Sequence, residues 1–428
     1  MILLIKNAII VNADKKETQP KDILIKNGVI EKIDSHIHTE KVSEVIDATG
    51  KLVMPGLIDI HVHFRVPGQE HKETIETGSQ AAVKGGFTTV MCMPNTRPVV
   101  DNAPIVESII NEAKRIGLCR VIPIGAITRG QMGEDLVEMF ELKEAGCLAL
   151  SDDGKPVFNS QVMRRALEYA KMVGLLLIQH CEDMQLSTCG VMNEGVVSTR
   201  LGLKADPGIS ESVIVARDIE LAHYLNAPVH FAHMSSKRSI ELIRMAKAQG
   251  IKVTAEATPH HFTLTEEEVE SFDPNTKMNP PLRTQEDVEA VKKGLKDGTI
   301  DCIATDHAPH SKEDKELGFD EAPFGIIGLE TAVGLTVTEL VNKGILTWEQ
   351  MVDKMSTTPA KIIGLKDQGV IKEGAAADIT ILDPKKEWEV TAEDTLSKSK
   401  NTPFFGRKLK GRIYKTIFGG EVVYSEEE

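Results

Sequence analysis

The feature that most constrains the fold is an alternation of apolar runs and amphipathic stretches that continues from residue 57 to residue 343. Short apolar runs are typical of buried strands, and a 3.6-residue apolar period is typical of helices. The eight strand candidates are residues 57–64, 87–93, 120–127, 147–152, 175–181, 228–234, 252–257 and 301–306. The eight helical candidates lie near residues 74–84, 103–116, 133–145, 160–173, 211–225, 236–249, 284–297 and 328–343. Eight such repeats can close a parallel sheet, so we expect an α/β fold that is a (β/α)8 TIM barrel.

The alternative architecture is an open, doubly wound sheet. That fold binds its ligand through a glycine-rich loop that follows the first strand. Here the Gly85-Gly86 pair stands directly before the second strand candidate instead. The barrel is therefore the favoured prediction.

Both ends of the chain have short strand candidates and tight turns, without a helical period. The candidates are residues 2–5, 8–11, 22–25, 29–33 and 45–47 near one end, and 378–382, 411–417 and 421–424 near the other. Asn27-Gly28 and Gly419-Gly420 are turn signals between neighbouring candidates. We expect residues 1–55 and 367–428 to build one small β-sandwich together, beside a catalytic barrel of residues 56–366.

The charge balance argues against two classes of partner. The chain has 64 acidic residues against 50 Lys and Arg, a net charge of −14, and its basic residues form no cluster that could neutralise phosphates. No apolar run approaches the length of a membrane span, so we expect neither nucleic acid nor a membrane as partner. The six cysteines form no C-x-x-C pair, and the first apolar run ends at Lys6, too early for a secretion signal. These features favour a cytoplasmic location.

Potential metal ligands gather at the predicted carboxyl ends of the barrel strands, where barrel enzymes place their active sites. His61 and His63 are two residues apart in the first strand candidate, so a strand directs both imidazoles to one face. The ends of later strand candidates add carboxylates and imidazoles, which are Asp152, Asp153, His180, His233 and Asp306. An isolated H-x-H pair is more often structural, but this combined set has the composition of a paired zinc-type site.

Motifs at these strand ends resemble those of one family. They are D-I-H-V-H-F-R at 59–65, M-P-N at 93–95, D-D-G at 152–154, H-C-E-D at 180–183, N-P-P-L-R at 279–283, A-T-D-H-A-P-H at 304–310, P-F-G-I-I-G-L-E at 323–330 and S-K-S-K-N-T-P-F at 397–404. Over nearly the whole chain the sequence resembles the long bacterial dihydroorotases of the amidohydrolase superfamily. The H-x-H pair is common to the superfamily, whereas N-P-P-L-R with T-D-H-A-P-H and H-C-E-D is much narrower.

The resemblance implies a zinc site with one or two ions per subunit, two being favoured. It implies His61, His63 and Asp306 as ligands of the more buried ion, and His180 and His233 as ligands of the second. Many members of the superfamily bridge the ions with a carboxylated lysine on strand four, but residues 148–153 here contain no lysine. The long bacterial dihydroorotases are similar in having aspartate there, which implies Asp153 as the bridge, with Asp152 as the alternative.

The implied activity is the reversible cyclisation of N-carbamoyl-L-aspartate to (S)-dihydroorotate with loss of water, the third step of pyrimidine biosynthesis. Asp306 would take the proton of the attacking water and return it to the leaving ring nitrogen. The substrate is an anion, and Arg65 at the exit of the first strand can bind its carboxylate with two hydrogen bonds. The other residues implied in substrate binding are His63, Asn95, Asn279, His310, Phe324 and Gly325.

Two other functions remain as alternatives. A cyclic amidohydrolase of the dihydropyrimidinase or allantoinase type would not need a carboxylate clamp, and Arg65, Asn95 and His310 argue against it. A non-catalytic subunit that scaffolds aspartate transcarbamoylase would have lost metal ligands, whereas all the candidate ligands are present here. An active enzyme that also associates with aspartate transcarbamoylase stays possible in this scheme. We expect a homo-oligomer, with a dimer favoured.

Overall fold

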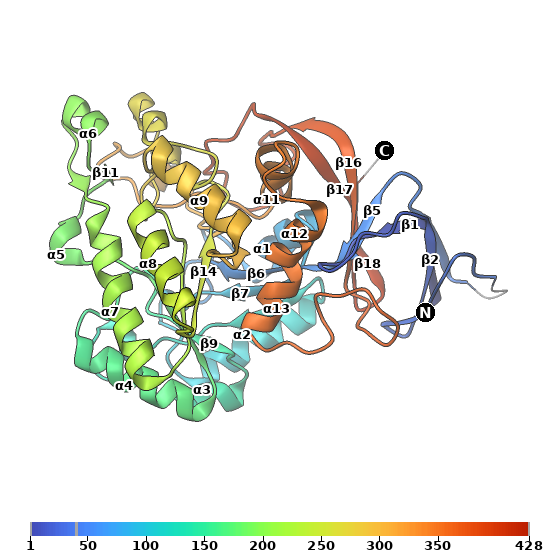
Figure 1. Cartoon of the computed structure of the whole chain (residues 1–428), viewed down its shortest axis with the longest axis horizontal. Helices are drawn as coiled ribbons and strands as arrows, with labels where there is room; N and C mark the ends of the chain where they lie inside the picture. The colour runs from blue at the N-terminus through green and yellow to red at the C-terminus, as the bar shows by residue number, and fades with distance from the viewer. Residues whose placement is uncertain (1, 39–41, 427–428) are drawn as a thin grey trace.

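The computed structural model describes residues 2–38 and 42–426, and it contains a closed barrel with a β-sandwich at one side (Figure 1). The barrel strands are β6 (Leu57–Val62), β7 (Phe87–Cys92), β8 (Arg120–Pro123), β9 (Ala149–Leu150), β10 (Leu176–Gln179), β13 (Val229–Phe231), β14 (Val253–Ala257) and β15 (Cys302–Ile303). They pair in two parallel runs, β6-β7-β8 and β9-β10-β13-β14-β15. Parallel bridges from Gly125 to Leu150 and from Val62 to His307 join the runs at both edges. The predicted barrel is therefore confirmed, and the open doubly wound sheet is wrong.

Helices surround the strands. They are α1 (Ile75–Lys84), α2 (Ala103–Ile116), α3 (Met139–Ala145), α4 (Ser160–Val173), α7 (Ile209–Leu225), α8 (Lys237–Ala248), α9 (Gln285–Asp297), α11 (Ala332–Thr336), α12 (Trp348–Val352) and α13 (Thr358–Ile362). The predicted windows 103–116 and 160–173 coincide with α2 and α4. Asn102 and Asn159 accept backbone N–H groups at the two helix starts, and the left-handed glycines Gly117 and Gly174 end the helices.

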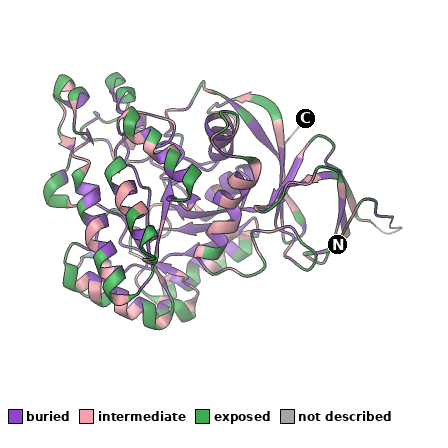
Figure 2. Ribbon diagram, in the orientation of Figure 1, coloured by how far each residue is buried: buried purple, intermediate pink, exposed green. Residues whose placement is uncertain are grey.

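The centre of the barrel is filled by side chains. Ile60, Met91, Ile122 and Ile178 belong to one buried apolar cluster that draws on several strands. In Figure 2 the barrel strands are mostly buried, and the helices around them expose their outer faces. Such a packed barrel holds the carboxyl ends of the strands in fixed positions, which a site assembled from many strands requires.

Strands from both chain ends form a second sheet system beside the barrel. They are β1 (Ile2–Ile10), β2 (Lys21–Lys26), β3 (Val29–Asp34), β4 (Glu44–Asp47), β5 (Leu52–Pro55), β16 (Ile379–Glu389), β17 (Lys408–Phe418) and β18 (Glu421–Ser425). Their order is β18-β17-β16-β5-β1-β2-β3, with β4 also paired to β1. Side chains from both ends, such as Leu3, Ile23, Ile381 and Ile417, share one buried core. The predicted sandwich is confirmed in this respect.

Two segments depart from the sequence patterns. Between β10 and α7 lies an insertion with α5 (Met184–Ser187), β11 (Met192–Asn193), α6 (Val196–Leu201) and β12 (Ala205–Asp206). Residues 390–407, between β16 and β17, return to the barrel, where the Ser397 hydroxyl donates to Glu73. Across residues 2–38 and 42–426, none of the helices has both the length and the apolar character to span a membrane.

Candidate active site

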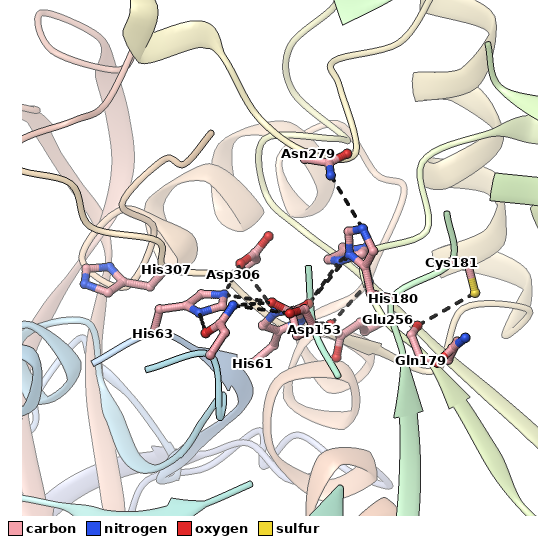
Figure 3. Close-up of polar contacts among 12 residues, drawn as sticks. His61, His63, Asp153, Gln179, His180, Cys181, Glu256, Asn279, Asp306 and His307 are labelled. Atoms are coloured by element: carbon pink, nitrogen blue, oxygen red, sulfur yellow. Dashed lines mark hydrogen bonds and ion pairs between the residues drawn. The ribbon is translucent and has the colours of Figure 1, made fainter. Parts of the chain in front are cut away.

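Histidines and aspartates from five strand ends meet at the mouth of the barrel (Figure 3). We use the name metal cluster for the six buried residues of this set, which are His61, His63, Asp153, His180, His233 and Asp306. Their potential ligand atoms form three overlapping groups, each compact enough to hold one ion. All six predicted metal ligands are thus brought together.

Asp153 lies at the centre of the metal cluster. Its Oδ1 is 3.6 Å from His61 Nε2, 3.6 Å from His180 Nδ1 and 3.7 Å from His233 Nε2. Its Oδ2 is 3.5 Å from His63 Nε2. Burial would raise the pKa of Asp153, but contacts with His180 and His233 hold it well below its usual range. The four distances exceed those of hydrogen bonds and suit groups that share a cation.

Asp152 occupies a different environment. Its Oδ1 accepts from the backbone N–H of Ile127 at 2.8 Å and of Thr128 at 3.2 Å, and its Oδ2 accepts from the Thr128 hydroxyl. Burial raises the pKa of Asp152 to about 6. This carboxylate organises the loop after β8, and the structure brings only Asp153 to the histidines.

The carboxylate of Asp306 lies close to the imidazoles of His61, in β6, and of His63, directly after β6. Its Oδ1 is 3.0 Å from His63 Nε2 and 3.4 Å from His61 Nε2. Asp306 and His233 have φ angles of 47° and 34°, a left-handed conformation that is uncommon for residues with a side chain. Such backbone strain persists where surrounding structure enforces it, commonly at functional sites.

The unpartnered Nε2 atom of His61 shows whether the metal cluster is suited to a cation. His61 Nδ1 donates to Glu256 Oε1 at 2.6 Å, while the buried His61 Nε2 has no hydrogen-bond partner among the described residues. Burial would lower the pKa of His61, but Asp306 and Glu256 raise it to about 10. The carboxylates of Asp153 and Asp306 therefore favour positive charge beside the unpartnered His61 Nε2, and the donor set fits a divalent metal ion.

Two glutamates outside the metal cluster hold its histidines in place through hydrogen bonds. Glu256 Oε1, in β14, also accepts from the His233 backbone N–H at 3.2 Å. Glu182 Oε2 lies 3.0 Å from His180 Nε2, so His180 turns Nδ1 to the metal cluster. Such partners set which ring nitrogen is free to bind metal. The sequence patterns predict no role for either glutamate, although Glu182 is part of H-C-E-D and Glu256 is a charged residue within an apolar run.

Asn95 contacts two residues of the metal cluster through its side-chain amide. Its Oδ1 lies 2.9 Å from His63 Nδ1, and its Nδ2 donates to Asp153 Oδ2 at 3.1 Å. By contrast, His307 turns away from the cluster in Figure 3 and contacts Glu73 at 3.3 Å.

A cavity of about 290 Å³ opens onto the metal cluster. Its walls include six of the seven predicted substrate-binding residues, namely His63, Arg65, Asn95, Asn279, His310 and Phe324. Arg65 is 8% exposed, and among the described residues its guanidinium forms no ion pair with a carboxylate. Burial lowers the pKa of Arg65 to about 10, although Asp306 and Asp153 act in the opposite direction. A buried cation with free donors makes this wall suited to an anion.

Gly325 is the exception among the predicted substrate-binding residues. Its N–H donates to Lys277 O at 3.0 Å, and its carbonyl accepts from Asn401 Nδ2 at 3.0 Å. Asn401 also accepts from the His310 N–H at 2.9 Å through Oδ1. Asn401 therefore holds two loops of the site from the distant segment 390–407, a role that barrel periodicity could not show.

The insertion between β10 and α7 contributes Met184, Cys189 and Gly190 to the cavity wall. These residues follow no strand end of the barrel, so the pattern used to find the site did not include them. The motif H-C-E-D, directly before the insertion, is the one sequence signal near them.

Comparison with known proteins gives a consistent family assignment. Residues 52–423 match the amidohydrolase family. The chain is 50% identical to a protein named dihydroorotase from Trichlorobacter lovleyi, over 99% of this chain and 100% of that protein. It is 54% identical to one of the same name from Pelotomaculum thermopropionicum, over 100% and 99%. A solved L-hydantoinase (dihydropyrimidinase) from Arthrobacter aurescens has a TM-score of 0.90 at 27% identity, covering 100% of this chain and 96% of that one.

Proposed function

Because the chain belongs to the amidohydrolase family and, within it, to the dihydroorotases, we propose that it interconverts N-carbamoyl-L-aspartate and (S)-dihydroorotate. The enzyme is a cyclic amide hydrolase, which in the hydrolytic direction cleaves the C–N bond of the ring amide. The observation that carries the substrate assignment is the buried Arg65, which faces the same cavity as the metal cluster.

We assign zinc to the metal cluster, with two ions per subunit. His61, His63 and Asp306 would hold one ion, His180 and His233 the other, and Asp153 would contact both. Two of the ligand groups, His61 with His63 and Asp153, and His180 with His233 and Asp153, support this division. When bound, zinc lowers the pKa of a coordinated water towards about 7 and polarises a carbonyl oxygen.

Asp306 is assigned the proton transfer. It lines the cavity, and its Oδ1 is held 3.0 Å from His63 Nε2. In hydrolysis its carboxylate accepts a proton from the attacking water and then delivers that proton to the ring nitrogen as the C–N bond breaks.

Arg65 and His310 are assigned to the substrate carboxylate, and Asn279 and Phe324 to the ring. The carboxylate clamp distinguishes the substrate from carboxylate-free rings such as dihydrouracil. The dihydropyrimidinase and allantoinase alternative is not favoured, since relatives at about 50% identity are named dihydroorotase. Retention of every candidate ligand likewise disfavours a non-catalytic subunit.

The proposal extends to assembly as a homodimer, with aspartate transcarbamoylase as a possible further partner. Val196, in the insertion, and Ile209, the first residue of α7, are 80% and 55% exposed, and we place them in the dimer contact. Light scattering on the purified protein, alone and with the transcarbamoylase, tests both associations.

Metal analysis combined with substrate comparison tests the activity. We expect about two zinc ions per chain and turnover of dihydroorotate far above that of dihydrouracil or allantoin. Preference for a carboxylate-free ring would contradict the substrate assignment, and full activity after complete metal removal would contradict the role of the metal cluster.

A further inference from the structure

His310 lies between two cations that can only donate hydrogen bonds. Its Nε2 is 3.2 Å from Arg65 Nη2, and its Nδ1 is 3.2 Å from Lys72 Nζ. His310 and Arg65 are 7% and 8% exposed, and the Lys72 side chain is 15% exposed. Neither a guanidinium nor an ammonium has an acceptor, so the ring must supply the lone pair in each contact.

The imidazole of His310 can satisfy only one of these contacts. Burial, followed by the charges of Arg65 and Lys72, holds the pKa of His310 well below its usual range, so the ring is neutral. A neutral imidazole has one N–H and one lone pair. One of the two contacts therefore places N–H groups face to face, which is unfavourable until an acceptor enters between them.

The surroundings show on which side an acceptor can enter. Asp314, in the short helix α10 (Lys312–Lys315), lies 3.1 Å from Lys72 Nζ and holds the ammonium on the Nδ1 side. The Ser399 hydroxyl donates to Lys72 O at 2.6 Å and fixes the backbone there. Arg65 and His310 line the substrate cavity, whereas Lys72 does not. The Nε2 side, next to Arg65, is therefore the side that faces the substrate cavity.

We propose that Lys72 is a positioning residue that fixes His310 as the Nε2–H tautomer. Lys72 donates to Nδ1, which leaves the ring proton on Nε2. His310 Nε2–H and the Arg65 guanidinium then both direct N–H groups at the same place. A carboxylate bound between them accepts from both and so removes the unfavourable contact between the two donors. The inference rests on the proposed function, since the anion is the carboxylate of dihydroorotate or carbamoyl aspartate.

The competing tautomer would place the proton on Nδ1, directed at Asp314. Asp314 Oδ2 is 3.5 Å from His310 Nδ1, farther than Lys72 Nζ at 3.2 Å. Asp314 is also engaged by the ammonium of Lys72. The shorter contact and the pairing of Asp314 both favour donation from Lys72.

Kinetics of Lys72→Met and Lys72→Arg test the proposal, with Lys312→Met as the control. Lys312 is a neighbouring lysine whose side chain is 84% exposed, so its loss changes the charge equally without affecting His310. We expect Lys72→Met to raise KM for dihydroorotate about tenfold with kcat little changed, because the lost interaction serves binding rather than the transition state. Lys72→Arg keeps a donor and should recover most of the loss, and Lys312→Met should match the wild type.

Nitrogen-15 NMR of histidine-labelled protein provides a readout independent of turnover. The His310 signals can be identified by their absence in His310→Asn. We expect a protonated Nε2 and an unprotonated Nδ1 in the wild type, and a mixture of tautomers in Lys72→Met. A wild-type proton on Nδ1, or equal KM values for Lys72→Met and wild type, would overturn the proposal. A wild type that does not turn over dihydroorotate would instead contradict the proposed function, and the NMR measurement would still decide the tautomer.

Discussion

Asp152 and Asp153 are adjacent in the chain, yet their carboxylates serve different parts of the structure. Asp152 accepts two backbone N–H groups from residues 127 and 128, after β8. The carboxylate of Asp153 lies between His61 in β6, His180 after β10 and His233 after β13. One carboxylate therefore stabilises a loop, and the other is placed to bind metal.

We expect an aspartate-to-asparagine substitution to have different consequences at positions 152 and 153. Asp153→Asn should lower metal affinity by at least about tenfold, because a central negative charge is lost, while the melting temperature of the metal-free protein changes little. Asp152→Asn should retain metal but lower the free energy of unfolding by roughly 1–3 kcal/mol, since its buried donors lose a charged acceptor. Metal analysis and thermal unfolding of both variants measure these effects. Equal metal loss in both variants would contradict the separation of roles.

Asp306→Asn should abolish turnover and leave the fold intact. The amide cannot accept the proton of water at neutral pH, and general acid–base catalysis typically contributes about 10²–10⁴-fold. Steady-state kinetics and circular dichroism measure the two properties, and metal content must be determined alongside them. Near-normal rates in Asp306→Asn would rule out the proton transfer assigned to this residue.

Arg65→Lys should weaken substrate binding far more than it changes metal content. Lysine retains the charge but not the planar pair of donors, so we expect kcat/KM for dihydroorotate to fall about tenfold or more. Arg65 Nε also donates to Pro309 O at 3.1 Å, which lysine cannot reproduce with the same geometry. Kinetics and metal analysis on one preparation separate the effects, and parallel loss of both properties would argue against a carboxylate clamp.

Glu182→Leu should weaken metal binding at the position formed by His180 and His233. Without an acceptor for Nε2–H, His180 loses the group that fixes its ring, and such losses typically cost about 10–100-fold in metal affinity. Glu194→Leu, at an exposed position of the insertion that follows Glu182, is the matched control. Zinc titration of metal-free protein should show one weakened ion in Glu182→Leu only; unchanged affinity would show that the glutamate does not orient His180.

The sequence predicted the parts of the fold that local chemistry specifies. Helices α2 and α4 start at asparagine caps and end at glycines, and for these the windows were accurate. Strands were predicted longer than observed, as for residues 147–152 against Ala149–Leu150, because hydrogen bonds to neighbouring strands define a strand and apolar runs do not. The insertion was missed because its short elements lack the period of the barrel.

The sequence by itself determined the barrel, the sandwich strands and the residue types of the metal cluster, since periodicity and strand-end position are local properties. Only the tertiary structure distinguished Asp153 from Asp152, paired the backbone of Gly325 with Lys277 and Asn401, and brought Glu256 and Lys72 to their partners. These relationships depend on how distant segments pack against one another. The chemistry of the site is therefore visible in the chain, whereas the direction of each side chain is decided by the surrounding packing.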